Sequence, residues 1–358
     1  MKIGFLTSGG DCAGLNTVMK KVVEKAALNN WTVIGIKNGK TGLCSDTPEV
    51  VTLTPDALPL GVEMLAGSYL GSDYRNDKLV QEKLAAGEMK YAAVTSDLDV
   101  IDFEPAFLAS VKKLELDALI ATGGDESLWL YSNLCKTANI PFIGVPKTID
   151  NDVPMTDYAL GFHSAVDRCT EMLDSLRTTA RSHHMYMVLE VMGHGIGDLA
   201  LYSGIDGGAD LILMPEFKYS KEGVQAKVKS VREVQKRNFG LIVLSEKLEV
   251  QEPEKYSSAG DEVRAWLKEI GQDARVNEGG YMQRGGKVVP FDRMMGAAMG
   301  SAAIDLIAEG HTDKMLIWKN REITSVGLDA VKEGKKKQLH ADLPIIRTAK
   351  KMNIYIGD

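Results

Sequence analysis

Short apolar runs alternate with longer amphipathic segments along the whole chain. Apolar runs of about 4–8 residues between glycine, proline or polar residues are typical of buried strands, and an apolar period near 3.6 residues is typical of helices. Strands are predicted at 2–6, 31–36, 118–122, 141–145, 185–191, 211–214 and 240–245, and helices at 15–28, 128–138, 158–179, 221–237 and 292–309. This alternation predicts an α/β protein in which helices cover both faces of mainly parallel sheets.

The length of the chain indicates more than one hydrophobic core. It has 358 residues, of which 44% are hydrophobic, which suits two domains that each bury a core of their own. No low-complexity stretch, obvious linker or short repeat interrupts the sequence. The residues alone therefore predict two domains without placing the boundary between them.

Charge and cysteine usage narrow the expected partners and compartment. The net charge is -7, and the only dense basic run is Lys335–Lys337, so we expect no nucleic-acid partner. No apolar run approaches the ~20 residues of a membrane span, and the first residues begin a strand directly, so we expect neither a membrane partner nor a signal peptide. The four cysteines are scattered, which favours reduced thiols and a cytoplasmic location.

Unusual loops follow several of the predicted strands. In parallel sheets the ligands gather at the carboxyl ends of the strands, which makes these loops the candidate sites. Four of them directly follow a strand, and a fifth precedes the helix that is expected to start near Pro290. They are TSGGDCAG (7–14), TGGDES (122–127), PKTIDND (146–152), MGHGIGD (192–198) and YMQRGG (281–286).

Two of these loops are rich in glycine and enter a helix. Glycine allows positive φ and close backbone approach, and a helix N-terminus attracts phosphate. Neither loop has the lysine and hydroxyl of a Walker P-loop or the spacing of a dinucleotide fingerprint. Each by itself could be an ordinary turn between a strand and a helix, but two at one sheet edge predict an anion cradle.

The loop PKTIDND carries two carboxylates with alternate spacing. Asp150 and Asp152 would point the same way in an extended segment, and one of them could take a proton from a hydroxyl nucleophile. Asp125 could hold Mg²⁺ directly or through water, and Lys147 could neutralise phosphate charge. A polar turn is the structural alternative for this loop.

The last of the unusual loops contains an arginine, Arg284, before two glycines. A guanidinium suits a planar anion, although a surface arginine beside a turn is the structural alternative. Glycine cradles, a metal-binding acid, a base and arginines together predict phosphoryl transfer, which depends mostly on positioning and charge neutralisation.

A set of motifs resembles the phosphofructokinase family in both order and spacing, from residue 1 to about 325. These motifs are Gly9-Gly10-Asp11 with Gly14-Leu15-Asn16, GGDES (123–127), PKTIDND (146–152), VMGHGIGDLAL (191–201), MPE (214–216) and YMQRGGKVVPFDR (281–293). The resemblance implies two Rossmann-like domains of three layers with the active site between them, in a homodimer or homotetramer whose sites are completed across an interface. The larger, donor-binding domain would comprise 1–160 plus about 283–325, the smaller, acceptor-binding domain about 161–282, and 326–358 would form a C-terminal tail.

The resemblance also implies roles for individual residues. Asp150 would be the base that deprotonates the sugar hydroxyl, supported by Thr148, Asp152 and Lys147. Mg²⁺ would be the cofactor, organised by Asp125. The implied donor-binding residues are Gly10, Gly124, Asp125, Glu126 and Ser127. The implied acceptor-binding residues are Met192, Gly193, His194, Glu216, Arg275, Tyr281 and Arg284, with Arg275 reaching a sugar phosphate in the neighbouring subunit.

Departures from the family pattern bear on the phosphoryl donor. Members that use ATP usually have glycine where Glu126 stands, whereas members that use pyrophosphate usually have aspartate there and lysine at the position of Lys147. An acidic side chain would repel the α-phosphate of ATP, and a lysine can bind pyrophosphate. Leu130 replaces a small glycine, and Lys40 replaces an aromatic residue near the nucleoside. These positions favour pyrophosphate, while ATP stays open because some ATP users also carry PKTIDND.

Other departures concern the acceptor. Met185 replaces an arginine that binds the phosphate of fructose 6-phosphate, and His194 replaces an arginine that stabilises the transferring charge. Tyr281 stands where histidine is common. A third arginine is either displaced to Arg75 or lost, with Tyr74 in its register.

Each lost charged hydrogen bond would cost about 1.5–3 kcal/mol of binding. Protonated histidines, His183, His184 and His194, could replace part of that charge, and neutral hydrogen-bonding side chains are the alternative. The prediction is a phosphotransferase with small-molecule partners, a phosphoryl donor and fructose 6-phosphate as acceptor. Two alternatives remain: a kinase of the same chemistry acting on another sugar, sugar phosphate or polyol, and a non-catalytic regulatory subunit, which the intact carboxylates disfavour.

Overall fold

The computed structural model describes residues 1–45, 47–73, 85–87, 93–94 and 101–357. These residues divide into two compact units, each with its own sheet and core. Unit 1 comprises Met1–Thr148, Val153–Gly161 and Arg284–Lys335, and unit 2 comprises Ile149–Asp152, Phe162–Gln283 and the chain from Lys336 on. Each unit is a three-layer α/β structure, which confirms the predicted fold class.

Unit 1 is built on a seven-stranded sheet in the order β13-β12-β7-β6-β1-β2-β3. The strands from β12 to β2 are parallel, and the edge strands β3 and β13 pair antiparallel to their neighbours. The sheet strands are β1 (Lys2–Thr7), β2 (Thr32–Ile36), β3 (Val50–Leu53), β6 (Ala118–Gly123), β7 (Phe142–Pro146), β12 (Lys314–Lys319) and β13 (Glu322–Gly327). A separate pair consists of β4 (Ala93–Val94) and β5 (Ile101–Asp102).

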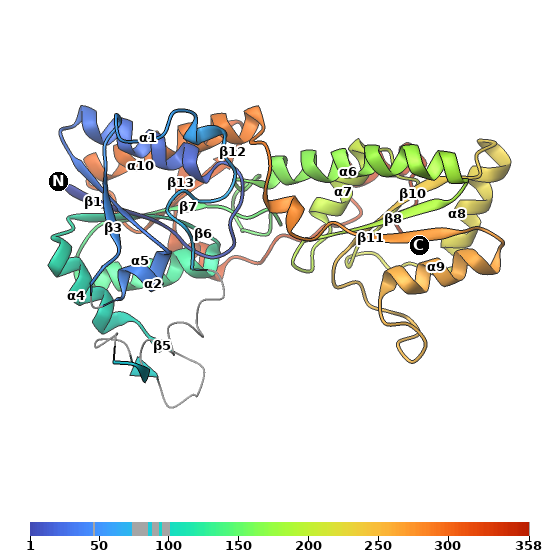
Figure 1. Cartoon of the computed structure of the whole chain (residues 1–358), viewed down its shortest axis with the longest axis horizontal. Coiled ribbons are helices and arrows are strands. Elements are labelled where there is room, and N and C mark those ends of the chain that lie inside the picture. Colours follow the sequence, from blue (N-terminus) through green and yellow to red (C-terminus); the bar gives the residue numbers. More distant parts are fainter. Residues whose placement is uncertain (46, 74–84, 88–92, 95–100, 358) are drawn as a thin grey trace. The chain divides into compact units, whose positions relative to one another are not determined.

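Helices cover both faces of this sheet. One face carries α1 and α10, which lie side by side, and the other carries α2, α4, α5 and α11 (Figure 1). The helices of unit 1 are α1 (Leu15–Leu28), α2 (Gly39–Leu43), η1 (Val62–Met64), α4 (Glu104–Leu114), α5 (Asp125–Ala138), α10 (Pro290–Ala308) and α11 (Leu328–Glu333). Because both faces are covered, the central strands are continuous apolar runs rather than alternating ones, and β6 is buried along its whole length.

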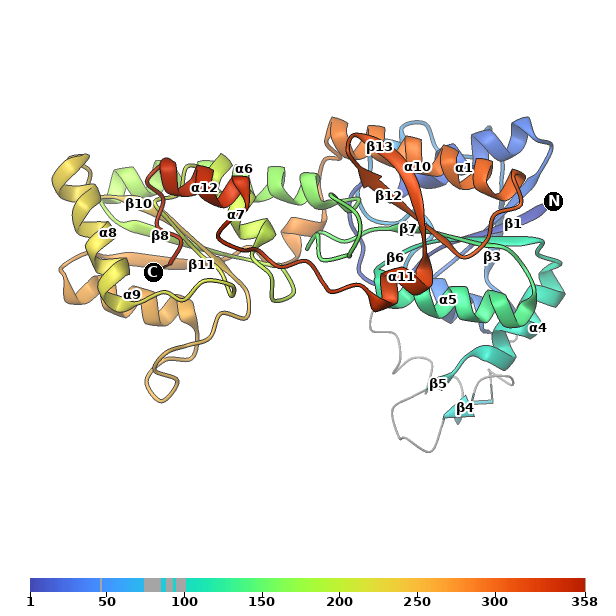
Figure 2. The same cartoon turned by 180° about the vertical axis from the view of Figure 1, so that it is seen from behind.

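Unit 2 contains a four-stranded, fully parallel sheet in the order β11-β8-β10-β9. Helices α6 and α7 pack on β10, whereas α8 and α9 pack on each other and α9 packs on β11. Its elements are α6 (Phe162–His183), β8 (Tyr186–Val191), α7 (Asp198–Asp206), β9 (Leu211–Leu213), α8 (Lys221–Val234), β10 (Gly240–Ser245), α9 (Ala259–Glu269), β11 (Ala274–Glu278), η2 (Gly280–Arg284) and α12 (Pro344–Lys351). After α12, which Figure 2 shows, the chain pairs with the edge strand β9 through Tyr355 and Leu211.

The predicted strands are all present, and one predicted helix is displaced. The helix expected at 158–179 runs from Phe162 to His183. Residues before it are held by the sheet of unit 1, because Tyr158 bridges to Trp318 and Leu160 bridges to Lys147. The apolar pattern of this stretch therefore reflects burial against a sheet and not a helical period. None of the helices among the described residues has the length and apolar character needed to cross a membrane.

Candidate active site

Three loops meet at the carboxyl edge of the sheet in unit 1. Strands β1, β6 and β7 are neighbours, so the loops that follow them begin side by side. The Ser8 amide donates to the Thr122 carbonyl at 2.9 Å, and the Lys147 amide donates to the Gly123 carbonyl at 3.0 Å. The chain leaves β1 toward β2 on one side, and β6 lies on the other, which is the switch point where α/β sheets bind ligands.

Lys147 lies buried within this loop cluster. Its side chain is buried, and the ammonium donates a hydrogen bond to the Gly10 carbonyl. Burial lowers the pKa of Lys147, and the Arg284 guanidinium acts in the same direction, whereas Cys12, Asp73 and Asp11 oppose the shift. The structure thus places a buried cation directly beside the glycines that the sequence predicted as a phosphate cradle.

Arg284 joins the same cluster in unit 1. Its Nη1 donates to the Asp11 carbonyl at 3.1 Å, and the guanidinium packs against Gly10 so closely that a Cβ there would collide with it. A larger residue at position 10 would therefore displace the Arg284 guanidinium from this loop. The sequence predicted Arg284 as an acceptor-binding residue, and the structure places it beside the donor loop.

Asp73 is a site residue that the sequence analysis missed. It is 4% exposed and accepts hydrogen bonds from the Gly9 amide at 2.8 Å, the Lys40 amide at 3.0 Å and the Ser8 hydroxyl at 3.3 Å. A buried carboxylate with three donors fixes the glycine loop in one conformation. The only signal in the sequence is an acid after Gly71-Ser72, a pattern that is also typical of ordinary turns.

The acidic pair Asp125-Glu126 lies in the first turn of α5. The helix starts after Gly124 with no side-chain cap, so its free amides and its dipole favour negative charge there. Asp125 is half-buried and Glu126 is exposed, and Ser127 lies near Gly9. The pair therefore stabilises its own helix as well as facing the carboxyl edge of the sheet.

Two other residues that bear on the donor have packing roles in unit 1. Leu130 packs against the buried core beneath α5. The Lys40 ammonium lies 5.0 Å from the centre of the Phe103 ring, a cation–π distance. Tyr74 stands at the position of the third family arginine, and Arg75 follows it. Both lie outside the described residues.

A magnesium ion can be accommodated by Asp125. Within the described ranges, no group of three or more His, Cys, Asp and Glu side chains forms a metal site. Mg²⁺ at phosphate sites commonly takes only one or two carboxylates and completes its shell with phosphate and water oxygens. A single half-buried carboxylate at the carboxyl edge of the sheet fits that donor set.

In unit 2, a tight turn after β8 presents His194. The Gly193 φ is +155°, and a Cβ there would collide with the Ile196 carbonyl. The His194 amide donates to Glu246 Oε1 at 2.7 Å, and Nδ1 lies 3.5 Å from the Lys247 ammonium, which can donate only to an unprotonated ring nitrogen. Lys247, which the sequence analysis missed, thus supplies a cation beside the position where the family arginine is absent.

Two buried polar side chains anchor the neighbouring loops. Gln283 is 2% exposed and accepts the Met192 amide at 3.0 Å. Glu216 Oε1 accepts the Gly197 amide at 3.0 Å, while burial raises the pKa of this carboxyl group. Its Oε2 is buried without a direct hydrogen bond among the described residues, and the Leu339 backbone, which lowers the pKa of this carboxyl group, lies close to it. Tyr281 is 65% exposed.

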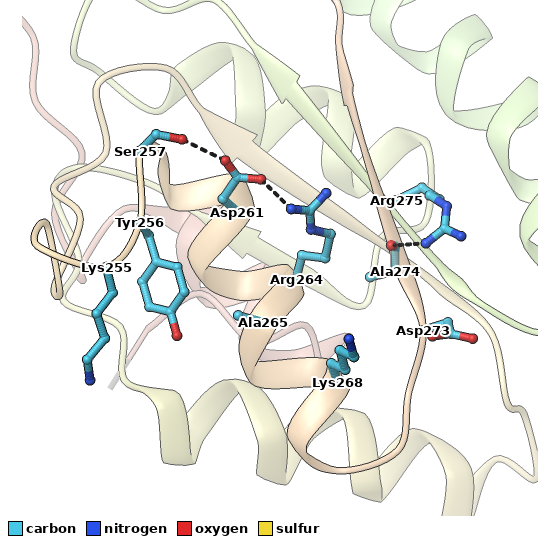
Figure 3. Close-up of a pocket in the computed structure, with 10 residues that line it drawn as sticks. All are labelled: Lys255, Tyr256, Ser257, Asp261, Arg264, Ala265, Lys268, Asp273, Ala274 and Arg275. Atoms are coloured by element: carbon cyan, nitrogen blue, oxygen red, sulfur yellow. Dashed lines mark hydrogen bonds and ion pairs between the residues drawn. The ribbon is translucent and has the colours of Figure 1, made fainter.

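Arg275 and Met185 do not join this group. Tyr186 pairs with Ala274 at the first residues of β8 and β11, so Met185 and Arg275 lie at the amino edge of the sheet. His194 and Glu216 follow the carboxyl ends of their strands, and a strand of five or six residues spans roughly 15–20 Å. Arg275 instead lines a cavity of about 700 Å³ together with Arg264 and Lys268 (Figure 3).

The loop 146–152 runs from unit 1 into unit 2. Thr148 donates its amide to the Leu160 carbonyl at 3.1 Å within unit 1, whereas Asp150 and Asp152 belong to unit 2. Asp150 is half-buried and Asp152 is 8% exposed. Asp150 is the third residue after Lys147, so the covalent chain keeps their Cα atoms within about 11 Å.

The cysteines are predicted to be unreactive in the folded protein. All four are buried free thiols, and burial raises the pKa of Cys12, Cys44 and Cys169 to about 12 and that of Cys135 well above its usual range. Only a thiolate attacks a disulfide reagent. We expect Ellman's reagent at pH 8 to modify less than one thiol per native chain and four after unfolding. Fast stoichiometric modification of the native chain would contradict this.

Glycine loops at the carboxyl edge of a parallel sheet, with a buried lysine and an arginine beside them, are typical of α/β proteins that bind phosphate. The chain belongs to the phosphofructokinase family, whose model, described as Phosphofructokinase, matches residues 2–307. This confirms the family resemblance of the motifs.

Individual relatives agree with this assignment. The chain is 37% identical to the ATP-dependent 6-phosphofructokinase 1 of Synechocystis sp., covering 100% of this chain and 98% of that protein. Its fold is similar to that of a pyrophosphate-dependent phosphofructokinase from Marinobacter aquaeolei, with a TM-score of 0.77, 20% identity and coverage of 100% and 93%. It is also similar to a phosphofructokinase chain from Saccharomyces cerevisiae, with a TM-score of 0.79 and 23% identity, where 99% of this chain matches 47% of the yeast chain.

Proposed function

We propose that the protein transfers a phosphoryl group from pyrophosphate to a hydroxyl of fructose 6-phosphate. The observation that carries this proposal is the Lys147 ammonium, buried against Gly10 in a glycine cradle and three residues before Asp150. A fixed cation at that place neutralises a phosphate without a reorganisation step. Relatives that are 36–37% identical to this chain are named 6-phosphofructokinases, which supports fructose 6-phosphate as the acceptor.

In the proposed reaction, Asp150 accepts the proton of the sugar hydroxyl as its oxygen attacks the terminal phosphorus. The bond from phosphorus to the bridging oxygen breaks, and phosphate leaves. Thr148 and Asp152 hold the base loop, while Lys147 and Arg284 neutralise the donor oxygens. Mg²⁺, held by Asp125, would neutralise further phosphate charge when bound.

The acceptor would be bound by residues of unit 2. Glu216 Oε2 would accept a sugar hydroxyl, and Lys247 beside His194 would supply positive charge. Met192, Gly193 and Tyr281 would shape the pocket. Because Arg275 lies at the opposite edge of its own sheet, its proposed contact with the acceptor requires a second copy of the chain, as in a homodimer or homotetramer.

ATP is the second candidate donor, because relatives that are 36–37% identical to this chain are named ATP-dependent. Glu126 separates the two donors, since its exposed carboxylate would repel the α-phosphate of ATP more than it affects the smaller pyrophosphate. We expect Glu126→Gly to raise the ratio of kcat/KM for ATP to that for pyrophosphate by about tenfold or more, equivalent to one close repulsive contact of about 1.4 kcal/mol. Glu126→Gln is the matched control that removes the charge and keeps the bulk. An unchanged ratio in both variants would show that Glu126 does not select the donor.

Another sugar or polyol is the second candidate acceptor, because Met185 replaces a phosphate-binding arginine of the family and His194 replaces an arginine that stabilises the transferring charge. A four-way assay tests both choices. It crosses pyrophosphate or ATP with fructose 6-phosphate or a panel of unphosphorylated sugars and polyols, in the presence of Mg²⁺. Turnover of fructose 6-phosphate with pyrophosphate supports the proposal. Activity on another acceptor alone would reject fructose 6-phosphate, and no activity on any acceptor would favour a regulatory subunit.

A further inference from the structure

The C-terminal segment of unit 2 reaches the loop that carries the proposed base. The Lys337 ammonium donates to Asn151 Oδ1 at 3.1 Å, and the Lys336 ammonium lies 3.6 Å from Asp152 Oδ2. Leu339 is buried, and its backbone favours the charged form of Glu216. Residues 336–339 were expected as part of a surface tail. They instead lie against the loop 146–152, which carries the proposed base, and against Glu216.

Asn151 is the centre of this contact. It is 2% exposed and has a positive φ of 58°, a conformation that asparagine tolerates better than most residues. Both ends of its amide are used, since Oδ1 accepts from Lys337 and Nδ2 donates to Asp198 Oδ2 at 2.7 Å. A side chain held at both ends, on a backbone in a restricted region, cannot rotate without breaking a hydrogen bond.

Asp198 completes the bridge at the first residue of α7. It is 8% exposed, and burial raises the pKa of its carboxyl group, while the Asn151 amide and the Lys337 charge lower it. The charged groups around it are Lys337 from the C-terminal segment and Glu216, whose pKa Asp198 raises. Lys337 is thus the cation that offsets the cost of a buried carboxylate at this place.

We propose that Lys337 is a positioning residue for the base loop: by bridging through Asn151 to Asp198, it fixes the direction of the flanking carboxylates of Asp150 and Asp152. Asn151 has a left-handed backbone conformation, and holding its side chain at both ends fixes that conformation and with it the direction in which the chain presents the two flanking residues. The role in turnover rests on the function proposed above. The role in loop order does not.

The test replaces Lys337 in the full-length protein. We expect Lys337→Met to lower kcat by about 10- to 100-fold, because a small misplacement of a reacting group has an effect of this size, and to change KM for the donor by less than threefold. Lys337→Arg, which can still donate to Asn151, should retain at least a third of kcat. Lys335→Met is the matched control, since Lys335 is an exposed lysine two residues earlier, and it should leave kcat within twofold.

Amide hydrogen exchange provides a readout that does not depend on activity. Peptides covering 148–153 should exchange at least tenfold faster in Lys337→Met than in the wild type or in Lys335→Met, whereas peptides from the sheet of unit 2 should exchange at the wild-type rate. Unchanged exchange in this loop would overturn the proposal whatever the kinetics. Faster exchange with no phosphotransfer by the wild type would leave the bridge supported and reject the proposed function. Equal kcat losses in Lys337→Met and Lys335→Met would overturn the link to turnover.

Discussion

Replacing Asp150 with asparagine is expected to lower kcat by about 10²–10⁴-fold while leaving the fold unchanged. The amide has nearly the same shape as the carboxylate but cannot accept the hydroxyl proton in the transition state. Asp150 is half-buried and adjoins Asn151, whose two anchoring hydrogen bonds do not involve it, so the loop should keep its conformation. Steady-state turnover with saturating donor and acceptor measures the effect.

The control for this variant is Asp174→Asn, which makes the same chemical change at an exposed position of α6 in the same unit. It should leave kcat within twofold. Circular dichroism and melting curves should coincide for both variants and the wild type. If Asp150→Asn keeps wild-type turnover, another group must accept the proton, and the mechanism proposed for this loop is wrong.

Replacing Lys147 with methionine should produce the second large effect, a loss of at least about 10²-fold in kcat/KM for the donor. The ammonium is the buried cation of the glycine cradle, and methionine fills similar space without charge. Because burial disfavours the charged form, as the lowered pKa shows, the melting temperature should stay the same or rise. Loss of donor use without loss of stability would distinguish a binding role from a structural one.

The lowered pKa of Lys147 also predicts how the stability and the donor use of the wild type change with pH. The pKa of Lys147 is lower in the folded than in the unfolded chain, so the unfolded chain binds more protons between the two values, and the contribution of Lys147 to stability increases as pH rises through that window. Donor use should fall over the same alkaline range as the ammonium loses its proton. Lys37→Met, at an exposed lysine of unit 1, is the matched control and should show the same alkaline fall in donor use as the wild type. If this fall persists in Lys147→Met, a group other than Lys147 causes it.

The central strands were predictable from the sequence because both faces of each sheet are covered. Strands β1, β6, β7 and β10 are buried over nearly all of their length and therefore appear as uninterrupted apolar runs. The edge strands β3, β11 and β13 are only partly buried, so polar residues interrupt their patterns, and they were not predicted. Strand β12 lies inside the sheet and has a buried apolar centre, and it was also not predicted. The start of α6 was misplaced because burial against a sheet and burial on a helix face give similar apolar patterns over four residues.

Candidate site residues were predictable where they lie close together in the sequence or follow adjacent strands. The glycine loops follow adjacent parallel strands, and Lys147 to Asp152 lie in one loop, so local sequence and strand order were sufficient to group them. Asp73 and Lys337 were missed because each acts on a loop that lies more than sixty residues away in the chain. A single acid or lysine in a loop carries no local pattern that distinguishes a buried anchor from a solvated side chain.

The sequence by itself determined the α/β class, the family and the residue types available for phosphoryl transfer, because these depend on periodicity and on motifs of a few residues. Only the tertiary structure decided which side chains are held in place: Lys147 and Arg284 at Gly10, Asp73 at Gly9, and Lys337 at Asn151. Within unit 2, it also separated Arg275 from His194 and Glu216 by the length of a strand. Such contacts join distant parts of the chain, and the free energy that fixes them comes from burial, which no local pattern records.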